Sequence, residues 1–550
     1  MPKKPSQPDR GDIYSSILLL ILIIGLALRI WGIFWTLPTS GGYSYHPDEI
    51  FQIASAEKID LGALNLNPQF YNYGAMYMYL VSALMSLGAS VGLTSRLVLV
   101  DWYLIARLLT ALLGAVTPYL VFLTASRLFD RKVGLAAALL AAITPVAVVH
   151  SHFATVDAPA TFWVAACLAT SARLARGASI RSIIFAGLFA GFAGATKYTT
   201  AIVLIAPLVA LLAEREAPFS KKLPPVGLAI AAALAGFVIG NPGCVLWADQ
   251  FGKGFLYEFS HARQGHGLVF VNTGPGWLFH IRSSLLYGLG LPYLLLSLAG
   301  LCVIARQRRR ESWFLLAFAL VYFATISLSP VRFARYVIPL TPVLAITAAA
   351  AIVNGFDSIA RLRWGRLRAR QTLLVSWLVV CVGALYYTLS YSMALDRLFD
   401  DKDPRFESVA WIKAHVPKGS AIALPTRPWF YSPAFSEWFT HPLPEERFLG
   451  LSRVKDYRLL ANPDLEWDSD LLRSARPDYV VVSDYEDLDA VRAKDPAALE
   501  YLRILRARYA VAAVIADRLR GGGLDFGTPE HLPHDLKYAS PRLTIYKRRT

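Results

Sequence analysis

Long apolar runs alternate with short charged segments over the first 395 residues of the chain. About 20 apolar residues are needed to cross the hydrocarbon core of a bilayer, and repeated runs near this length are typical of membrane-spanning helices. We expect about eleven spans, at residues 13–37, 103–126, 134–149, 159–171, 183–195, 199–212, 226–247, 285–305, 313–328, 336–353 and 372–391. The pattern therefore predicts a mainly α-helical, polytopic transmembrane bundle.

Six basic segments separate the apolar runs and predict a topology, at residues 1–10, 127–132, 173–181, 214–222, 306–311 and 361–370. Basic loops remain in the cytoplasm, so an even number of spans should separate each segment from the next. Three apolar runs lie between the basic segments at residues 1–10 and 127–132, and an even number of spans allows only two of them to cross the membrane. We therefore expect residues 75–92, a run rich in Ser and Gly, to form an interfacial or re-entrant helix. The N-terminus is then cytoplasmic.

From about residue 396 the pattern changes to shorter apolar runs and more charge, which predicts a second domain. Helical spacing is found at residues 404–416 and 495–509, and strand-like runs occur at 419–425, 476–486, 510–517 and 542–549. We expect a transmembrane domain over 1–395 and a non-cytoplasmic, soluble α/β domain over 396–550, with residues 519–535 as a flexible loop. The second domain has no nucleotide-binding glycine pattern, and we expect it to cover an outer site or bind an acceptor.

Composition supports a membrane protein and argues against a nucleic-acid partner. The 550 residues are 55% hydrophobic and 17% charged, and the mean hydropathy is +0.43. The net charge of +16 comes from Lys and Arg placed in short loops, which is a topology signal. The four cysteines lack metal-ligand spacing and are interpreted as small buried residues. We therefore expect a multi-pass protein of the cell (inner) membrane, with its second domain periplasmic or extracellular.

The predicted topology brings most of the unusual polar residues to one membrane face. The outer loops would be residues 39–74, 150–158, the junction at Lys197, 248–282 and 329–335. They carry His46, Asp48, Glu49, His150, His152, Asp157, Lys197, Glu258, His261, Arg263, His266, Arg332 and Arg335. Ionisable groups that converge from many spans indicate a functional site at the bilayer surface.

Several of these residues also have a structural interpretation. Asp48, Glu49 and Asp157 are placed where acids cap helix N-termini, and Lys197 could snorkel to the interface. The histidines are interpreted as interfacial hydrogen-bonding groups more readily than as metal ligands. The functional interpretation is that these residues bind a lipid-linked sugar phosphate. Cations would then stabilise the departing phosphate, and a carboxylate would accept the proton of an incoming hydroxyl.

Five segments resemble a known family, in the order in which that family carries them. They are HPDEIFQIASAEKI, FATVDAPATFW, GATKYTTAIVLIAP, YEFSHARQ and RFARYVIPLTPVL. The chain resembles the multi-spanning glycosyltransferases that use polyprenyl-phosphate sugars, namely the protein O-mannosyltransferases and, most nearly, the lipid A aminoarabinose transferases. The resemblance covers about residues 14–350 and implies a GT-C fold with an outer catalytic loop at residues 38–75.

The resemblance also implies roles for individual residues. It makes Asp48 the base, places Asp157 in the second acidic loop and makes Lys197 a phosphate-binding residue. It marks His261 as a site histidine and Tyr336 as a tyrosine near the donor. In one respect the chain departs from the aminoarabinose enzymes. Asn72 and Tyr73 stand where those enzymes carry an acid–lysine pair, which removes one phosphate cation and one potential metal ligand.

The sequence hypothesis is an inverting glycosyltransferase that moves a sugar from a polyprenyl-phosphate carrier to a hydroxyl of a protein, lipid or polysaccharide. Its expected catalytic residues are Asp48, Glu49 and Asp157, and Glu49 supports the loop. Its expected donor phosphate-binding residues are Lys197, Arg332, Arg335 and Tyr336, and its expected substrate-binding residues are His46, Tyr73, His152, His261 and Arg263. No redox cofactor is needed; no metal site is predicted, although a divalent metal is left open. The alternatives are a lipid or solute transporter and a non-catalytic assembly protein with an outer ligand-binding domain.

Overall fold

A computed structural model describes residues 10–38, 44–213, 218–307, 309–362, 367–400, 402–435, 453–454, 456–462 and 464–549. Parts of the predicted N-terminal, 214–222, 306–311 and 361–370 basic segments and of the outer loop at 39–74 lie outside these residues. The helices of the bundle are α1 (Arg10–Ile30), α2 (Glu49–Lys58), α3 (Met76–Ser90), α4 (Leu99–Leu128), α5 (Arg131–Ala142), α6 (Pro145–Val149), α7 (Asp157–Leu174), α8 (Ile180–Thr196), η1 (Tyr198–Leu204), α9 (Ile205–Leu212), α10 (Phe219–Gly240), α11 (Gly243–Leu246), α12 (Ala248–Gln264), α13 (Gly276–Phe279), η2 (His280–Leu285), α14 (Leu286–Leu289), α15 (Leu291–Gln307), η3 (Arg310–Ser312), α16 (Trp313–Leu328), η4 (Ala334–Leu340), α17 (Thr341–Ala360) and α18 (Leu367–Arg397).

Among the described residues, six helical segments are long and apolar enough to span a membrane. They are Ile13–Ile30, Leu99–Leu128, Phe219–Gly240, Arg310–Leu328, Ala334–Ala360 and Arg368–Arg397, and a bent pair, Gly276–Leu289 with Leu291–Gln307, makes a seventh if it counts as one span. The expected count of about eleven is higher. The other four predicted runs are helical but short or interrupted, and they form α5 with α6, α7, α8, and η1 with α9. The chain is a mainly helical, multi-pass membrane protein.

Proline and glycine cause two of the interruptions. Pro145 begins α6 and holds Thr144 in an extended conformation, because the proline ring excludes the helical conformation of the preceding residue. Gly290 adopts φ +81°, which favours glycine, and there the axis bends by 116° between α14 and α15. Both interruptions were hidden inside continuous apolar runs.

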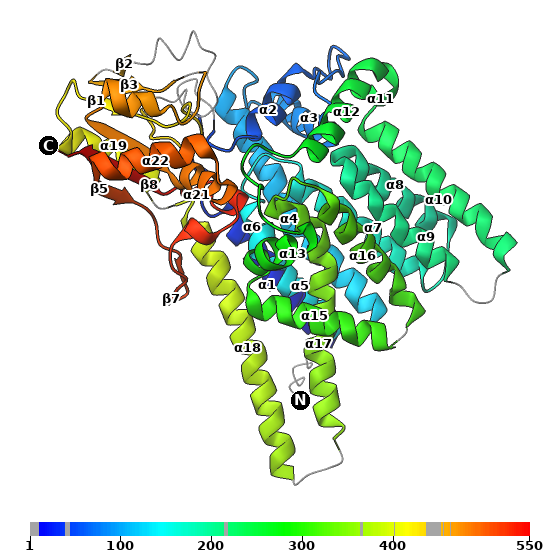
Figure 1. Ribbon diagram of the computed structural model, residues 1–550. Coiled ribbons are helices and arrows are strands. Elements are labelled where there is room, and N and C mark those ends of the chain that lie inside the picture. The colour runs from blue at the N-terminus through cyan, green and yellow to red at the C-terminus, as the bar shows by residue number, and fades with distance from the viewer. Residues whose placement is uncertain are drawn as a thin grey trace, which may run out of the picture.

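The two ends of the bundle differ in their side chains. The 30-residue helix α4 rises by about 1.5 Å per residue, so its ends lie roughly 45 Å apart. At its C-terminal end, Asp130, Arg309 and Arg361 line one hollow of about 220 Å³, so three predicted basic segments meet there. At its N-terminal end, Trp102 packs in one cluster with Ile53 of α2. Figure 1 shows α2, α3, α11 and α12 gathered across this second end.

The C-terminal domain contains a six-stranded mixed sheet in the order β2-β3-β1-β4-β8-β5. Strand β1 pairs in parallel with β3 and β4, whereas β8 is antiparallel to β4 and β5, and β2 to β3. Its elements are α19 (Pro404–His415), β1 (Ala421–Ala423), β2 (Arg453–Val454), β3 (Tyr457–Leu460), η6 (Leu471–Ala475), β4 (Tyr479–Ser483), α21 (Asp484–Ala493), α22 (Pro496–Arg508), β5 (Tyr509–Ile515), β6 (Arg520–Gly521), β7 (Leu524–Asp525), η7 (Pro529–His531), η8 (His534–Leu536) and β8 (Leu543–Arg548). The predicted helices and strands of this domain are present.

The prediction of a flexible loop at 519–535 is wrong. This segment forms the β6–β7 hairpin and the turns η7 and η8, and it packs against the bundle. The hydroxyl of Tyr386 on α18 donates to the carbonyl of Gly522, and a side chain at Gly521 would collide with the Ser390 carbonyl. The glycines that suggested flexibility instead permit close approach of the two backbones. Figure 1 shows the domain resting beside the end of the bundle that carries α2.

Candidate active site

The turn before α2 places two neighbouring carboxylates in different surroundings. Asp48 is the N-cap of α2, but its side chain makes no capping hydrogen bond, so the cap interpretation does not account for it. His46 is buried and its Nδ1 accepts a hydrogen bond from the Asp48 amide at 3.1 Å. Burial, with the nearby charges of Arg335, His150 and Arg107, holds the pKa of His46 well below its usual value. A neutral His46 therefore fixes the turn from which Asp48 projects.

Asp48 belongs to a chain of alternating charges that joins four parts of the sequence. Its Oδ2 lies 2.8 Å from Nη2 of Arg335, whose Nε lies 4.0 Å from Oδ2 of Asp157. The Oδ1 of Asp157 accepts a hydrogen bond from Nζ of Lys197 at 2.5 Å. We call Asp48, Arg335, Asp157 and Lys197 the open cluster, because the Asp48 side chain is 25% exposed whereas the other three are at most 9% exposed.

The helix ends of the bundle hold these four side chains in place. Asp157 is the first residue of α7, Lys197 joins α8 to η1, and Arg335 lies in η4. Lys197 is buried rather than snorkelling, and its Nζ lies 4.7 Å from the centre of the Tyr336 ring. Two buried cations and two carboxylates can exchange partners with an incoming anion such as a phosphate, because Arg and Lys bind phosphate and carboxylate alike.

Glu49 occupies a closed pair instead. Its two carboxylate oxygens accept hydrogen bonds from Nε and Nη2 of Arg107 at 2.8 and 2.7 Å. The amide of Ala154 donates a further bond to Oε1 at 2.7 Å, and both side chains of the pair are at most 1% exposed. The Glu49 carboxylate is therefore held by three hydrogen bonds, and it makes none of the ion pairs of the open cluster. These contacts agree with the predicted role of Glu49 in supporting the loop.

Two ionisable groups from other segments, Tyr73 and Glu258, interact electrostatically with the open cluster. Burial raises the pKa of Tyr73, and the charges of Asp48 and Glu258 raise it further. Burial also raises the pKa of Glu258 on α12, against the opposing effect of Lys197 and Arg335. Both groups thus lie within electrostatic reach of the cluster. Gly74 follows Tyr73 and touches the backbone of Ala195, where a side chain would collide with its carbonyl, so the loop can approach the end of α8.

The C-terminal domain also reaches the site. The Asp535 carboxylate accepts hydrogen bonds from the backbone amides of Ala334 and Arg335 at 2.9 and 2.7 Å, and lies 3.4 Å from Nε2 of His150. Burial alone would raise the pKa of Asp535, but the His150 contact, the Arg335 charge and the backbone amide lower it to about 2. Tyr538 lies beside Arg335 and packs edge-on against His46.

Other predicted residues do not join the open cluster. Both ring nitrogens of His152 lie at backbone carbonyls, those of Val148 and Trp31. Arg332 donates to Thr273 and to the carbonyls of Gly274 and Ser329, so the structure separates it from Arg335.

The two predicted residues on α12 lie elsewhere as well. His261 Nε2 lies 3.3 Å from Nδ1 of His266, and Arg263 covers the ring of Phe259. Burial and the charges of His261 and Arg335 lower the pKa of His266 to about 4. Across the described part of the chain, no three His, Cys, Asp or Glu side chains are grouped to hold a metal ion.

Sequence reasoning gave no role to four residues that shape the site: Arg107, Glu258, Asp535 and Tyr538. Arg107 lay inside a predicted span, where a charge itself is a signal of function or of a buried partner. Glu258 was placed on the outer face but given no task. Asp535 and Tyr538 carried no local signal, because their contacts depend on how the C-terminal domain docks.

Comparison with known proteins confirms the resemblance that the five segments predicted. Residues 77–239 match the sequence model of the family described as dolichyl-phosphate-mannose-protein mannosyltransferase. Over 300 residues the chain is 26% identical to undecaprenyl phosphate-alpha-4-amino-4-deoxy-L-arabinose arabinosyl transferase 1 of Pseudomonas fluorescens. That alignment covers 53% of this chain and 53% of the relative, so it spans about half the length of each protein.

Two solved structures show that the fold is shared. The structure of ArnT from Cupriavidus metallidurans in the apo state aligns with a TM-score of 0.51 at 16% identity, over 96% of this chain and 98% of that one. The archaeal oligosaccharyltransferase AglB from Archaeoglobus fulgidus, in complex with an inhibitory peptide and a dolichol-phosphate, aligns with a TM-score of 0.51 at 14% identity, over 97% and 78% of the two chains. Asp157 and Lys197 lie within the residues matched by the family, and Asp48 and Arg335 lie outside them.

Proposed function

We propose that the chain is an inverting glycosyltransferase that moves a sugar from a polyprenyl-phosphate carrier to an acceptor hydroxyl. The observation that carries the proposal is the open cluster at one end of the bundle, in which the partly exposed Asp48 contacts buried Arg335, and Asp157 links Arg335 to buried Lys197. The family match and the similarity to an undecaprenyl-phosphate-dependent arabinosyl transferase support a lipid-phosphate donor. The shared fold is consistent with this assignment.

In the proposed reaction, Asp48 is the general base. The acceptor hydroxyl gives its proton to the Asp48 carboxylate, and its oxygen forms a bond to the anomeric carbon. The bond between that carbon and the phosphate oxygen breaks, and the polyprenyl phosphate leaves with the electron pair. Attack opposite the leaving group inverts the anomeric centre.

Arg335 and Lys197 would bind the phosphate as its negative charge develops. Both cations contact carboxylates in the structure, so the donor phosphate would take over part of the contacts made by Asp48 and Asp157. The Arg335 contact to Asp48 would weaken at the same time, which frees that carboxylate to accept a proton. Tyr73 and Glu258 would border the sugar, and Glu49 would hold the loop through Arg107.

We also infer that the site faces the non-cytoplasmic side of the cell membrane, with the N-terminus in the cytoplasm and residues 396–550 outside. The basic segments around Asp130, Arg309 and Arg361 meet at the end of the bundle remote from α2, which the positive-inside rule assigns to the cytoplasm. Cysteine labelling in intact cells tests this orientation. A label-accessible cysteine at residue 130 from outside the cell would contradict it.

Incubation of the purified protein with a panel of polyprenyl-phosphate sugars tests the activity. We expect mass spectrometry to detect free polyprenyl phosphate with at least one donor, because either transfer or slow hydrolysis releases it. Membrane extract supplied as a mixture of acceptors should increase the release. If the donors remain intact under all conditions, the proposal fails and a transport or assembly role is favoured.

A further inference from the structure

A cavity of about 170 Å³ lies where the C-terminal domain meets the bundle. The bundle contributes the Phe270 and Phe279 side chains and Arg332, and the domain contributes residues from α21 and from the segment 530–537, including Leu488 and Asp535. A single water needs about 10–15 Å³ measured in the same way, so the cavity accepts a group with the size of one sugar ring. The proposed reaction has so far given this cavity no role.

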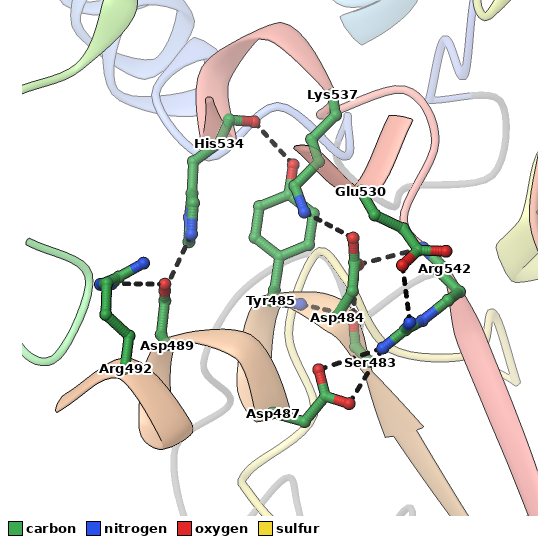
Figure 2. A network of polar contacts seen from close by, with 10 residues as sticks. All are labelled: Ser483, Asp484, Tyr485, Asp487, Asp489, Arg492, Glu530, His534, Lys537 and Arg542. Atoms are coloured by element: carbon green, nitrogen blue, oxygen red, sulfur yellow. Dashed lines mark hydrogen bonds and ion pairs between the residues drawn. The ribbon is translucent and has the colours of Figure 1, made fainter. Parts of the chain in front are cut away.

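The carboxylates around the cavity are already paired, and Arg332 donates to Thr273 and to the Gly274 carbonyl instead of a carboxylate. Figure 2 shows Asp484 with Lys537, Asp489 with His534 and Arg492, and Glu530 with Arg542. The fourth carboxylate, Asp535, is held by His150 and two backbone amides. An anionic ligand would lie against four carboxylates, and a cationic ligand would have to break one of these partly or fully buried pairs, which is costly. The wall therefore favours an uncharged ligand that uses the remaining acceptor and donor positions.

The lining also contains apolar side chains, those of Phe270, Phe279, Leu488 and Leu532. Ligand sites commonly combine aromatic and aliphatic surface with a few fixed polar groups. Hydroxyl groups both donate and accept hydrogen bonds, so they can meet carboxylates and guanidinium groups alike. A neutral saccharide offers such hydroxyls at its rim and C–H groups on its ring faces, which matches the mixed polar and apolar lining of the cavity.

The cavity adjoins the open cluster. Asp535 lines the cavity and at the same time binds the amide of Arg335, whose guanidinium contacts Asp48. The membrane loop that lines the cavity is fixed to the domain, since Arg492 donates to the Val271 carbonyl and Asn272 donates to the Arg492 carbonyl. A ligand in the cavity would thus lie beside Asp535, which binds the backbone of the arginine that contacts the proposed base.

We propose that this cavity binds a neutral sugar ring of the acceptor, so that the acceptor class is a saccharide or a glycolipid bearing one. The inference rests on the proposed transfer reaction, because it names the molecule whose hydroxyl gives its proton to Asp48. The bonds that form and break are those of the proposed reaction, and the cavity contributes binding and orientation. Arg332 is then part of the acceptor-binding cavity and does not bind the donor phosphate.

A filled cavity provides the test. Leu488 is 39% exposed on α21, and Leu488→Trp should block the cavity without changing charge. Leu499 is 41% exposed on α22 and does not line the cavity, so Leu499→Trp is the matched control. Saturation-transfer NMR with methyl hexosides measures binding to the full-length protein. Release of polyprenyl phosphate, with and without these hexosides, measures transfer and hydrolysis separately.

We expect Leu488→Trp to lose the hexoside signal and to lower hexoside-dependent transfer by about tenfold or more, with hydrolysis of the donor unchanged. The control should match the unmodified protein in both assays. Equal hexoside signals in the two variants would overturn the proposal, and so would transfer to hydroxyl-bearing peptides that hexosides do not inhibit. Absence of donor release from any protein would refute the transfer reaction instead, while the NMR comparison would still decide whether the cavity binds sugars.

Discussion

Asp48 and Glu49 are neighbours in the sequence, but they differ in exposure and in ion-pair partner in the structure. Asp48 is 25% exposed and contacts Arg335 in the open cluster, whereas Glu49 is fully buried in the closed pair with Arg107. Adjacent residues at the start of a helix point about 100° apart, so one can face a ligand while the other faces the protein. The comparison teaches that two neighbouring carboxylates in a sequence can divide into one partly exposed group and one fully buried group with different partners.

The largest expected effect comes from Asp48→Asn, which keeps the shape of the side chain but removes its basicity. Transfer should fall by about 10²–10⁴-fold, the usual contribution of a positioned base. The midpoint of thermal unfolding should fall less than in Glu49→Gln, because Asp48 is partly exposed and Arg335 keeps Asp157 at 4.0 Å. Mass spectrometry of released polyprenyl phosphate measures the transfer, and a fluorescence melt in detergent measures the midpoint of unfolding. Undiminished transfer would remove Asp48 as the base.

Glu49→Gln should have the reverse signature. Removal of one partner from a buried ion pair typically destabilises a protein by about 3–5 kcal/mol, because Arg107 would keep an uncompensated charge. We expect a large fall in the unfolding midpoint, with the folded fraction retaining donor release. Glu57→Gln on the same helix is the control, since Glu57 is exposed. A stable Glu49→Gln protein without activity would place Glu49 in catalysis after all.

A third experiment compares two arginines that lie three residues apart. Arg335→Gln should lower donor release by about 10–100-fold, since a hydrogen bond to a charged group is worth roughly 1.5–3 kcal/mol. Arg332→Gln should leave hydrolysis of the donor nearly unchanged, because Arg332 binds Thr273 and Gly274 rather than the open cluster. Equal losses of hydrolysis in the two variants would return Arg332 to the donor phosphate.

The smallest expected effect concerns the contact between the two domains. Asp535→Asn should cost about 1–3 kcal/mol of stability at neutral pH, because the backbone amides of Ala334 and Arg335 lose a charged acceptor. The folded-state pKa of Asp535 is about 2, below the usual value of about 3.9, so its contribution is present above about pH 4 and is lost as the pH falls towards 2. Melting curves of both proteins between pH 7 and pH 2 should converge at the acid end. A constant gap would show that the Asp535 charge is not involved.

The sequence by itself determined the class of the protein and the existence of the candidate site. Apolar runs and basic loops gave a multi-pass helical protein, because the bilayer imposes span length and charge placement on any chain that crosses it. The same reasoning brought Asp48, Asp157, Lys197 and Arg335 to one face, and the structure joins these four through ion pairs. The multi-pass topology and the common membrane face of these residues depend only on the composition of each segment and on the order of the segments along the chain.

The tertiary structure alone decided how the charges are distributed among partners. It assigned Glu49 to Arg107, separated Arg332 from Arg335, and interrupted apolar runs that looked continuous. It also showed that the glycine-rich segment after residue 519 packs against the bundle. Asp535 at the end of this segment accepts a hydrogen bond from the amide of Arg335, 200 residues away in the sequence. An ion pair or a docking contact depends on distances of a few ångströms between remote segments, and a sequence pattern carries no such distances.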